Sequence, residues 1–365
     1  MERLLGILAI AIFVSSPALG SERCTDGAIK PSVVIQSWGG WVGDDALLSN
    51  GDLMQEPGFR LRRARFGVAG KLGKITKYSL ELDVLDQERT GGPLHEAWVE
   101  IGACNCAKTR IGVQKLPFMK SELFSSSRLS FLDRSSATMA MSPAHAMGLT
   151  LSSSPWKDKL NLSLGVFNAL RRTDHFYGGY EGVGMTLGNR YEGLAYVGHI
   201  ELEPFGTLGD SVADRKSSTA FLLGLGGSGF YNDGSSITTL GYSAYLHMKF
   251  AGFHLFGEWA SDTASPTKEP TSLETINSET GRQVFNVQTG YMILPGTLGI
   301  AIRGELIDDN VDEDEHGDEM IISGTGSYYF NDGKMSLQLE YSHRREVSGP
   351  TLDNDHVMVG LALKF

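Results

Sequence analysis

The last ten residues of the chain, His356 to Phe365 (HVMVGLALKF), constrain its fold more than any other stretch. Apolar residues occupy every second position from Val357 to Phe365, and mostly small or polar residues lie between them. Because a strand directs alternate side chains to opposite faces, one face of this strand is apolar. The aromatic end is typical of the closing strand of an outer-membrane barrel. A soluble β-sandwich strand alternates in the same way but gives no reason for the terminal Phe365.

The first twenty residues predict export. Arg3 precedes an apolar run from Leu4 to Val14, and Ala18-Leu19-Gly20 has the small-residue pattern of a cleavage site. The run is shorter than the roughly 20 apolar residues that a membrane helix needs. We therefore expect a signal peptide at residues 1–20 and a mature domain at residues 21–365.

Composition narrows the classes of protein that remain. After residue 20 no apolar run reaches the length of a membrane helix, so a membrane span has to be made of strands. The 45 glycines and the mean hydropathy of −0.12 fit a barrel with many turns. The formal net charge of −11 argues against nucleic acid as a partner.

Alternation of apolar and polar residues recurs along the chain without a sustained helical period. Clear examples are residues 78–84, 160–166, 285–291, 298–303 and 335–341. About sixteen such runs follow Val33, and short connections alternate with long ones, as in barrels with turns at one rim and loops at the other. We predict an all-β, transmembrane antiparallel β-barrel of porin size, wide enough for an aqueous channel. Pro204 to Lys216 is long where a short turn is expected, and Asn232 to Gly234 is short where a loop is expected.

No catalytic or metal motif accompanies this pattern. Cys24, Cys104 and Cys106 are too few for a disulfide scaffold, and the Cys104-x-Cys106 turn is either a local disulfide or two free thiols. The acidic stretch Asp308 to Glu319 has Glu313 where a calcium loop needs glycine, which favours a solvated outer loop or loose bridging of divalent cations. We expect no cofactor, no metal site and no catalytic residue. An outer-membrane barrel hydrolase and a secreted all-β binding protein are the alternatives.

Several basic residues are expected to line the lumen. Phe66 and Val68 have the parity of lipid-facing residues, which directs Arg63, Arg65 and Lys71 inward. By the same parity argument, Arg110 and Arg303 also lie on polar faces. Several acids share these faces and are expected inward as well: Glu81, Asp83, Glu258, Glu305 and Glu340. Arg60 and Arg62 share the parity of Phe66, so we expect them outside, at the outer rim. The inward arginines either attract anions or pair with neighbouring carboxylates in a mixed field.

The long segment from Pro117 to Ala144 is the candidate for a loop that narrows the channel. It holds Lys120, Arg128 and Arg134 among many serines. Long loops are frequently functional, and a plain surface loop is the alternative.

Three stretches resemble the porin O and P family, the phosphate-selective porins. They are FRLRRARFGVAGKLG from Phe59, RIGVQKLPFMKSELFSSSRLSFLDRSSA from Arg110 and LNLSLGVFNA from Leu160. The resemblance implies a sixteen-stranded barrel, a homotrimer, a third loop folded into the lumen, and anion conduction by basic residues. The residues carried over by position are Arg63, Arg65, Lys120, Arg128 and Arg134.

Two departures from the family pattern concern basic positions. His145 stands where the family often has arginine, and the strand ending at Pro204 has His199 with Glu201 and Glu203 instead of an arginine. These departures argue against strict phosphate selectivity and leave the channel interpretation intact.

The leading hypothesis is a porin of the bacterial outer membrane, in contact with its lipid. It would pass small hydrophilic solutes by diffusion, either without preference or with a preference for anions such as phosphate.

Overall fold

The computed structural model describes residues 29–43, 57–85, 93–104, 107–156, 159–172, 179–181, 193–234, 237–267, 279–312, 318–348 and 351–365. The signal peptide, Cys24, Cys106 and the middle of the acidic stretch lie outside these ranges, so the expectations for them stay predictions. Among the described residues, no helix has the length and hydropathy needed to cross a membrane.

Within the described ranges, sixteen strands form one barrel, as the alternation predicts. The barrel strands are β1 (Lys30–Val42), β2 (Gly58–Leu72), β3 (Thr76–Asp83), β4 (Leu94–Cys104), β5 (Ala107–Lys115), β6 (His145–Ser153), β7 (Leu160–Asn168), β10 (Leu194–Leu202), β11 (Leu222–Asp233), β12 (Ile237–Phe250), β13 (Phe253–Pro266), β14 (Thr280–Leu294), β15 (Leu298–Asp308), β16 (Glu319–Phe330), β17 (Met335–Glu346) and β18 (His356–Lys364). The shorter elements are α3 (Lys120–Leu123), η2 (Ser126–Arg128), α4 (Ser136–Met141), η3 (Asn331–Gly333), and the pair β8 (Arg171–Arg172) and β9 (Tyr180–Glu181), which forms a separate small sheet.

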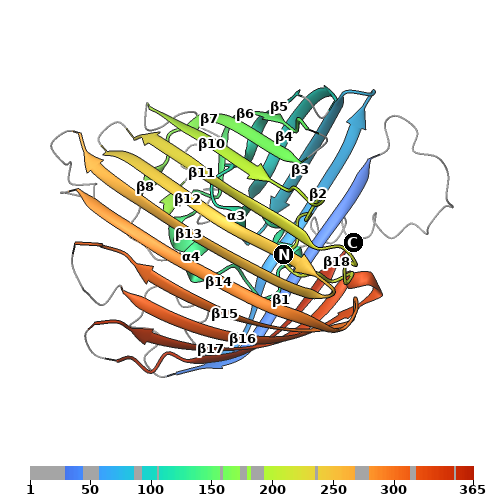
Figure 1. Cartoon of the computed structure of the whole chain (residues 1–365), viewed down its shortest axis with the longest axis vertical. Helices are drawn as coiled ribbons and strands as arrows, with labels where there is room; N and C mark the ends of the chain where they lie inside the picture. The colour runs from blue at the N-terminus through green and yellow to red at the C-terminus, as the bar shows by residue number, and fades with distance from the viewer. Residues whose placement is uncertain are drawn as a thin grey trace, which may run out of the picture.

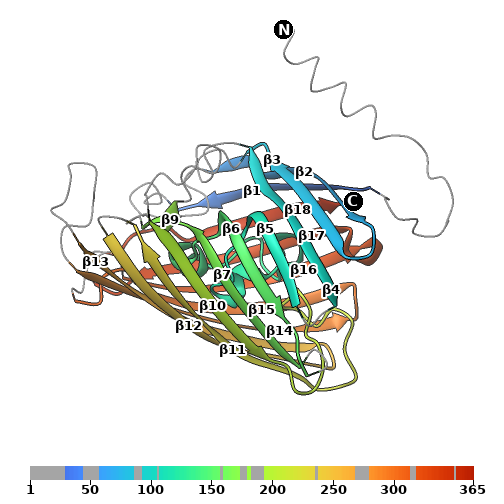
Figure 2. The ribbon, with the colours of Figure 1, turned by 90° about the horizontal axis from the view of Figure 1, so that it is seen from above.

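The barrel closes because its first and last strands pair. Each barrel strand is antiparallel to the next, and β1 joins β18 in a register that runs from Val34 opposite Lys364 to Val42 opposite His356. The tilted strands and their closed ring are visible in Figures 1 and 2. Closure removes the unpaired sheet edges, so the backbone hydrogen bonds are satisfied without water.

The two faces of the sheet differ as the sequence pattern predicts. On β18, Val357, Val359 and Leu361 are exposed on the outer surface, whereas His356 and Met358 are buried on the inner one. The outer face of this single-layered barrel is therefore apolar and free to contact lipid. A secreted binding protein would instead have to bury these apolar faces against one another.

Connections are short at one end of the barrel and long at the other. The short-turn end uses Gly73, Gly252 and Gly296, each at positive φ, where a residue with a side chain would be strained. The two predicted exceptions are confirmed. Residues 203–221 form a long connection between β10 and β11 at the short-turn end, and β11 and β12 are separated only by residues 234–236 at the opposite end.

Residues 117–144, which we call the inner loop, fold into the barrel. Its helices α3 and α4 lie inside the ring of strands in both views (Figures 1 and 2). Phe118 and Met141 are almost fully buried in one cluster with the inward-facing Phe230 and Val284. This burial does not fit a plain surface loop.

Candidate functional site

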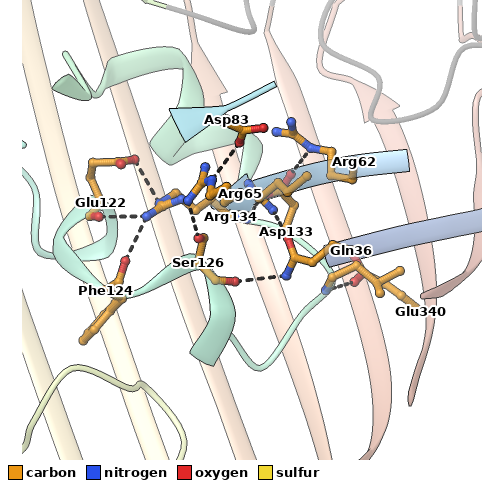
Figure 3. A network of polar contacts seen from close by, with 12 residues as sticks. Gln36, Arg62, Arg65, Asp83, Glu122, Phe124, Ser126, Asp133, Arg134 and Glu340 are labelled. Carbon is orange, nitrogen blue, oxygen red and sulfur yellow. Dashed lines mark hydrogen bonds and ion pairs between the residues drawn. The ribbon is translucent and has the colours of Figure 1, made fainter. Parts of the chain in front are cut away.

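Asp133 of the inner loop binds two guanidinium groups of β2 (Figure 3). Its carboxylate lies 2.8 Å from Nε of Arg62 and 2.6 Å from Nη2 of Arg63, and Arg63 also donates to Gln36 at 2.7 Å. Burial alone would raise the pKa of Asp133. The two adjacent guanidinium groups outweigh it and hold the pKa of this carboxyl far below its ordinary value.

The prediction for Arg60 and Arg62 was wrong, because β2 contains an irregularity. In the register between β1 and β2, Gln36 lies opposite Arg63, but the next residue of β1, Ser37, lies opposite Leu61. Arg62 is therefore an extra residue in β2. Such a bulge resets the alternation beyond it. Arg62 therefore reaches Asp133, and the Arg60 guanidinium lies 5.7 Å from the ring of Trp38, which is buried on the inner face.

Arg65 binds a carboxylate of the barrel wall, and Arg134 binds one within the inner loop. Arg65 lies 2.7 Å from Asp83 and donates to the hydroxyl of Ser126 at 2.9 Å (Figure 3). Arg134 lies 2.9 Å from the carboxylate of Glu122 and donates to the carbonyl oxygen of the same residue at 3.0 Å. Both guanidinium groups are thus paired with acids as well as attached to the loop.

Inward carboxylates of the barrel wall hold the backbone of the inner loop. Glu258 accepts N–H groups of Lys120 and Ser121 at 2.5 and 3.1 Å, Glu305 accepts that of Ala137 at 3.0 Å, and Glu340 accepts that of Leu132 at 2.8 Å. Sequence parity predicts these acids inward, but it cannot show that they bind backbone instead of lining water.

Lys120 and Arg303 complete the contacts between the loop and the wall. The Lys120 ammonium lies 2.5 Å from Glu201. Arg303 lies 2.7 Å from Glu305 and donates to the carbonyl oxygen of Asp133 at 3.2 Å. These two predicted residues are therefore buried and paired.

The remaining predicted cations lie apart from these buried contacts between the inner loop and the barrel wall. Arg110 is 2.7 Å from Glu100 and is about one-third exposed, and Arg128 pairs with Asp210. Lys71 is exposed near the short-turn end. The structure thus brings most of the predicted residues to the inner loop, and it favours the interpretation in which arginines pair with carboxylates.

A polar cavity of about 420 Å³ remains between the inner loop and strands β2–β7. Its charged and imidazole side chains are those of Arg65, Glu81, His95, Glu96, Arg110, Lys115, His145 and Asp210. The rings of His95 and His145 lie 4.3 Å apart. Within the described ranges, no group of three or more His, Cys, Asp or Glu side chains is arranged to hold a metal ion.

Sequence reasoning missed two residues that form ion pairs with or within the inner loop at this site, Arg62 and Asp210. Arg62 was placed outside, and the signal that could have corrected this is the Arg62-Arg63 pair, which interrupts the alternation of β2. Asp210 was passed over because its segment has no strand pattern, and only its position in a connection of unexpected length marked it.

These features define a class of protein. A closed barrel with an apolar outer face, a folded-in loop and a polar cavity beside that loop is a transmembrane channel of the porin type. Residues 41–225 match the family described as phosphate-selective porin O and P. The chain belongs to this family, as the resemblance predicted, and it is an outer-membrane channel.

Solved structures agree with this fold. The anion-selective porin from Comamonas acidovorans is 13% identical, with a TM-score of 0.57 over 93% of this chain and 99% of that one. The outer-membrane channel DcaP of Acinetobacter baumannii is 11% identical, with a TM-score of 0.57 over 95% and 100%. The trimer form of in-vitro folded OmpT from Vibrio cholerae is 11% identical, with a TM-score of 0.56 over 93% and 100%. No curated protein sequence matches the chain.

Proposed function

We propose that the chain forms a water-filled pore through which small hydrophilic solutes diffuse, with the inner loop as its constriction. The observation that carries this proposal is the polar cavity of about 420 Å³ between the inner loop and strands β2–β7. A hydrated solute can exchange part of its water shell for the hydroxyl and charged groups that line such a cavity.

The charges of the cavity support weak selectivity. Its cations are Arg65, Arg110 and Lys115, and its carboxylates are Glu81, Glu96 and Asp210. A phosphate ion would have to compete with carboxylates for the guanidinium groups, which offsets its attraction to them. We therefore propose a general porin with at most a modest preference for anions. Phosphate selectivity is the second candidate, and the description of the family favours it.

Planar-bilayer recording tests both candidates. The purified barrel should give single-channel currents, and reversal potentials in a KCl gradient should give a chloride-to-potassium permeability ratio of about one to five. Phosphate at millimolar concentration should leave the chloride current nearly unchanged. Saturating block of that current by phosphate would favour the second candidate, and the absence of any channel would contradict the pore itself.

The proposal includes a homotrimer in the bacterial outer membrane, reached through a cleaved signal peptide. The trimer form of OmpT supports the oligomeric state by analogy of fold. The family and the fold also favour a channel over the barrel hydrolase that the sequence left open.

A further inference from the structure

The connection between β10 and β11, residues 203–221, enters the lumen from the short-turn end. Among the described connections at that end, β12 and β13 are separated only by Ala251 and Gly252, and β14 and β15 only by residues 295–297. A barrel needs no more than such turns to close. The additional residues between β10 and β11 therefore call for a separate reason.

Inward side chains of β12 hold this connection inside the barrel. Val212 is 1% exposed, and its carbonyl oxygen lies 3.0 Å from a ring nitrogen of the buried His247. Lys249, itself 5% exposed, donates to the carbonyl oxygens of Leu208 at 2.7 Å and Ser211 at 2.6 Å. Because the buried ammonium group of Lys249 donates both of these hydrogen bonds to the connection, it fixes the position of the connection.

The connection meets the inner loop at the point where the two approach from opposite ends of the barrel. Asp210 forms an ion pair with Arg128, and its carbonyl oxygen accepts the N–H of Ser125 at 3.3 Å. The hydroxyl of Ser211 donates to the carbonyl oxygen of Arg128 at 3.2 Å. Backbone and side-chain contacts thus join the two segments.

The ion pair at this junction remains accessible to solute. The side chains of Arg128 and Asp210 are 43% and 57% exposed, and Asp210 lines the cavity beside Ser125. Arg65, Arg110 and Lys115 line the same cavity from the barrel wall. The carboxylate of Asp210 therefore lies in the lining of the same cavity as these three cations.

We propose that residues 203–221 are a second selectivity-determining segment of the pore, and that Asp210 is its specificity-determining residue. Its carboxylate neutralises Arg128 and repels anions that the wall cations attract, which keeps the channel close to unselective. This inference rests on the proposed pore function. It predicts that removing one carboxylate both deletes a negative charge and frees a guanidinium group at the passage.

Asp210→Asn tests the inference in the full-length, refolded barrel. The chloride-to-potassium permeability ratio at 0.1 M KCl should rise about two- to threefold, since an exposed charge acts weakly but is screened little at low salt. Asp332→Asn is the matched control. It makes the same charge change at the short-turn end, in the turn before β17, and does not line the cavity, so its ratio should stay at the wild-type value.

Arg128→Gln provides the test with the opposite sign, because it leaves Asp210 without its partner. The chloride-to-potassium permeability ratio should fall by a similar factor. If D210N does not fold, Arg128→Gln serves as the test in its place. Wild-type ratios in both variants, with normal conductance, would overturn the role of Asp210 while leaving the pore intact. Failure of the wild-type protein to form channels would instead overturn the proposed function.

Discussion

The two sides of the lumen use the same residue types in different ways. On the covered side, formed by β1 and β10–β18, inward carboxylates accept N–H groups of the inner loop, and Leu132 packs against Trp38 and Met358. On the open side, formed by β3–β7, inward charged side chains face the cavity. Strand β2 serves both sides, with Arg63 at the loop and Arg65 at the cavity.

Two ion pairs of similar geometry illustrate what this difference means energetically. Arg63 lies 2.6 Å from Asp133 on the loop, and Arg110 lies 2.7 Å from Glu100 on the open side. Removing one partner of a buried pair leaves an uncompensated charge and costs about 3–5 kcal/mol. In the second pair Arg110 is about one-third exposed, and the buried Glu100 also has Lys77 at 3.2 Å, so removing Arg110 should cost only about 0–1 kcal/mol. Burial, and not distance, decides which pairs stabilise the fold and which affect permeation.

Asp133→Asn should have the largest effect on the free energy of unfolding. It removes the carboxylate that faces the buried Arg63 and the partly buried Arg62, so we expect a loss of about 3–5 kcal/mol in the free energy of unfolding. Urea unfolding of the barrel refolded in lipid vesicles measures this loss. A change below about 1 kcal/mol would show that the pair is effectively solvated, and that the covered side is wetter than the contacts indicate.

The stability lost in the same variant should depend on pH. The folded pKa of Asp133 lies far below its ordinary value of about 3.9, so the ionised carboxylate stabilises the wild-type barrel fully above about pH 5. This contribution declines as the pH falls below the ordinary value and toward the folded one. The stability difference between wild type and D133N should therefore shrink between pH 5 and pH 2. A difference that does not change with pH would contradict the assignment.

Glu258→Ala should have the next largest effect. The change leaves the buried N–H groups of Lys120 and Ser121 without an acceptor, at a cost of about 2–4 kcal/mol in the free energy of unfolding. The first turn of the inner loop should detach, and the single-channel current should become larger and noisier. The control is Glu96→Ala on the open side, which lines the cavity and should change stability by less than about 0.5 kcal/mol. Equal losses in the two variants would remove the distinction between the two sides.

Gly360→Ala tests how closely the loop approaches the covered side. A Cβ at this position would lie 2.1 Å from Cδ2 of Leu132, so the leucine has to move at a cost of about 1–3 kcal/mol. Gly326→Ala is the matched control, because nothing lies within 4 Å of a Cβ there. Thermal or urea unfolding should separate the two variants. Equal stabilities would mean that the contact at Gly360 relaxes without cost.

The barrel could be predicted from the sequence because a period of two places each side chain on a known face. The outward set on β18, from Val357 to Leu361, follows from that period alone. The prediction failed at Arg62, because one extra residue in β2 reverses the parity beyond it and leaves no mark except a pair of adjacent arginines. The alternation of faces therefore predicts orientation only along a strand without such an irregularity.

The site was less predictable than the fold, because its contacts join residues far apart in the chain. Parity predicts Glu258 and Glu340 inward, but their partners, Lys120 and Leu132, lie on a loop whose path the sequence does not specify. For the same reason parity places Met358 on the inner face but does not show that it is fully buried beneath the inner loop. Which inward residues face water depends on where the loop lies, and no pattern of residues encodes that.

Arg110→Gln should have the smallest effect and defines the open side most directly. Arg110 is about one-third exposed beside Glu100, so its loss should lower the chloride-to-potassium permeability ratio by less than about twofold at 0.1 M KCl and leave stability within about 0.5 kcal/mol. Glu100→Gln should raise the ratio by a similar factor, and both shifts should vanish at 1 M KCl, where the screening length is only about 3 Å. A shift that persists in high salt would place this pair in a narrow, poorly hydrated passage, and the open side would then resemble the covered one.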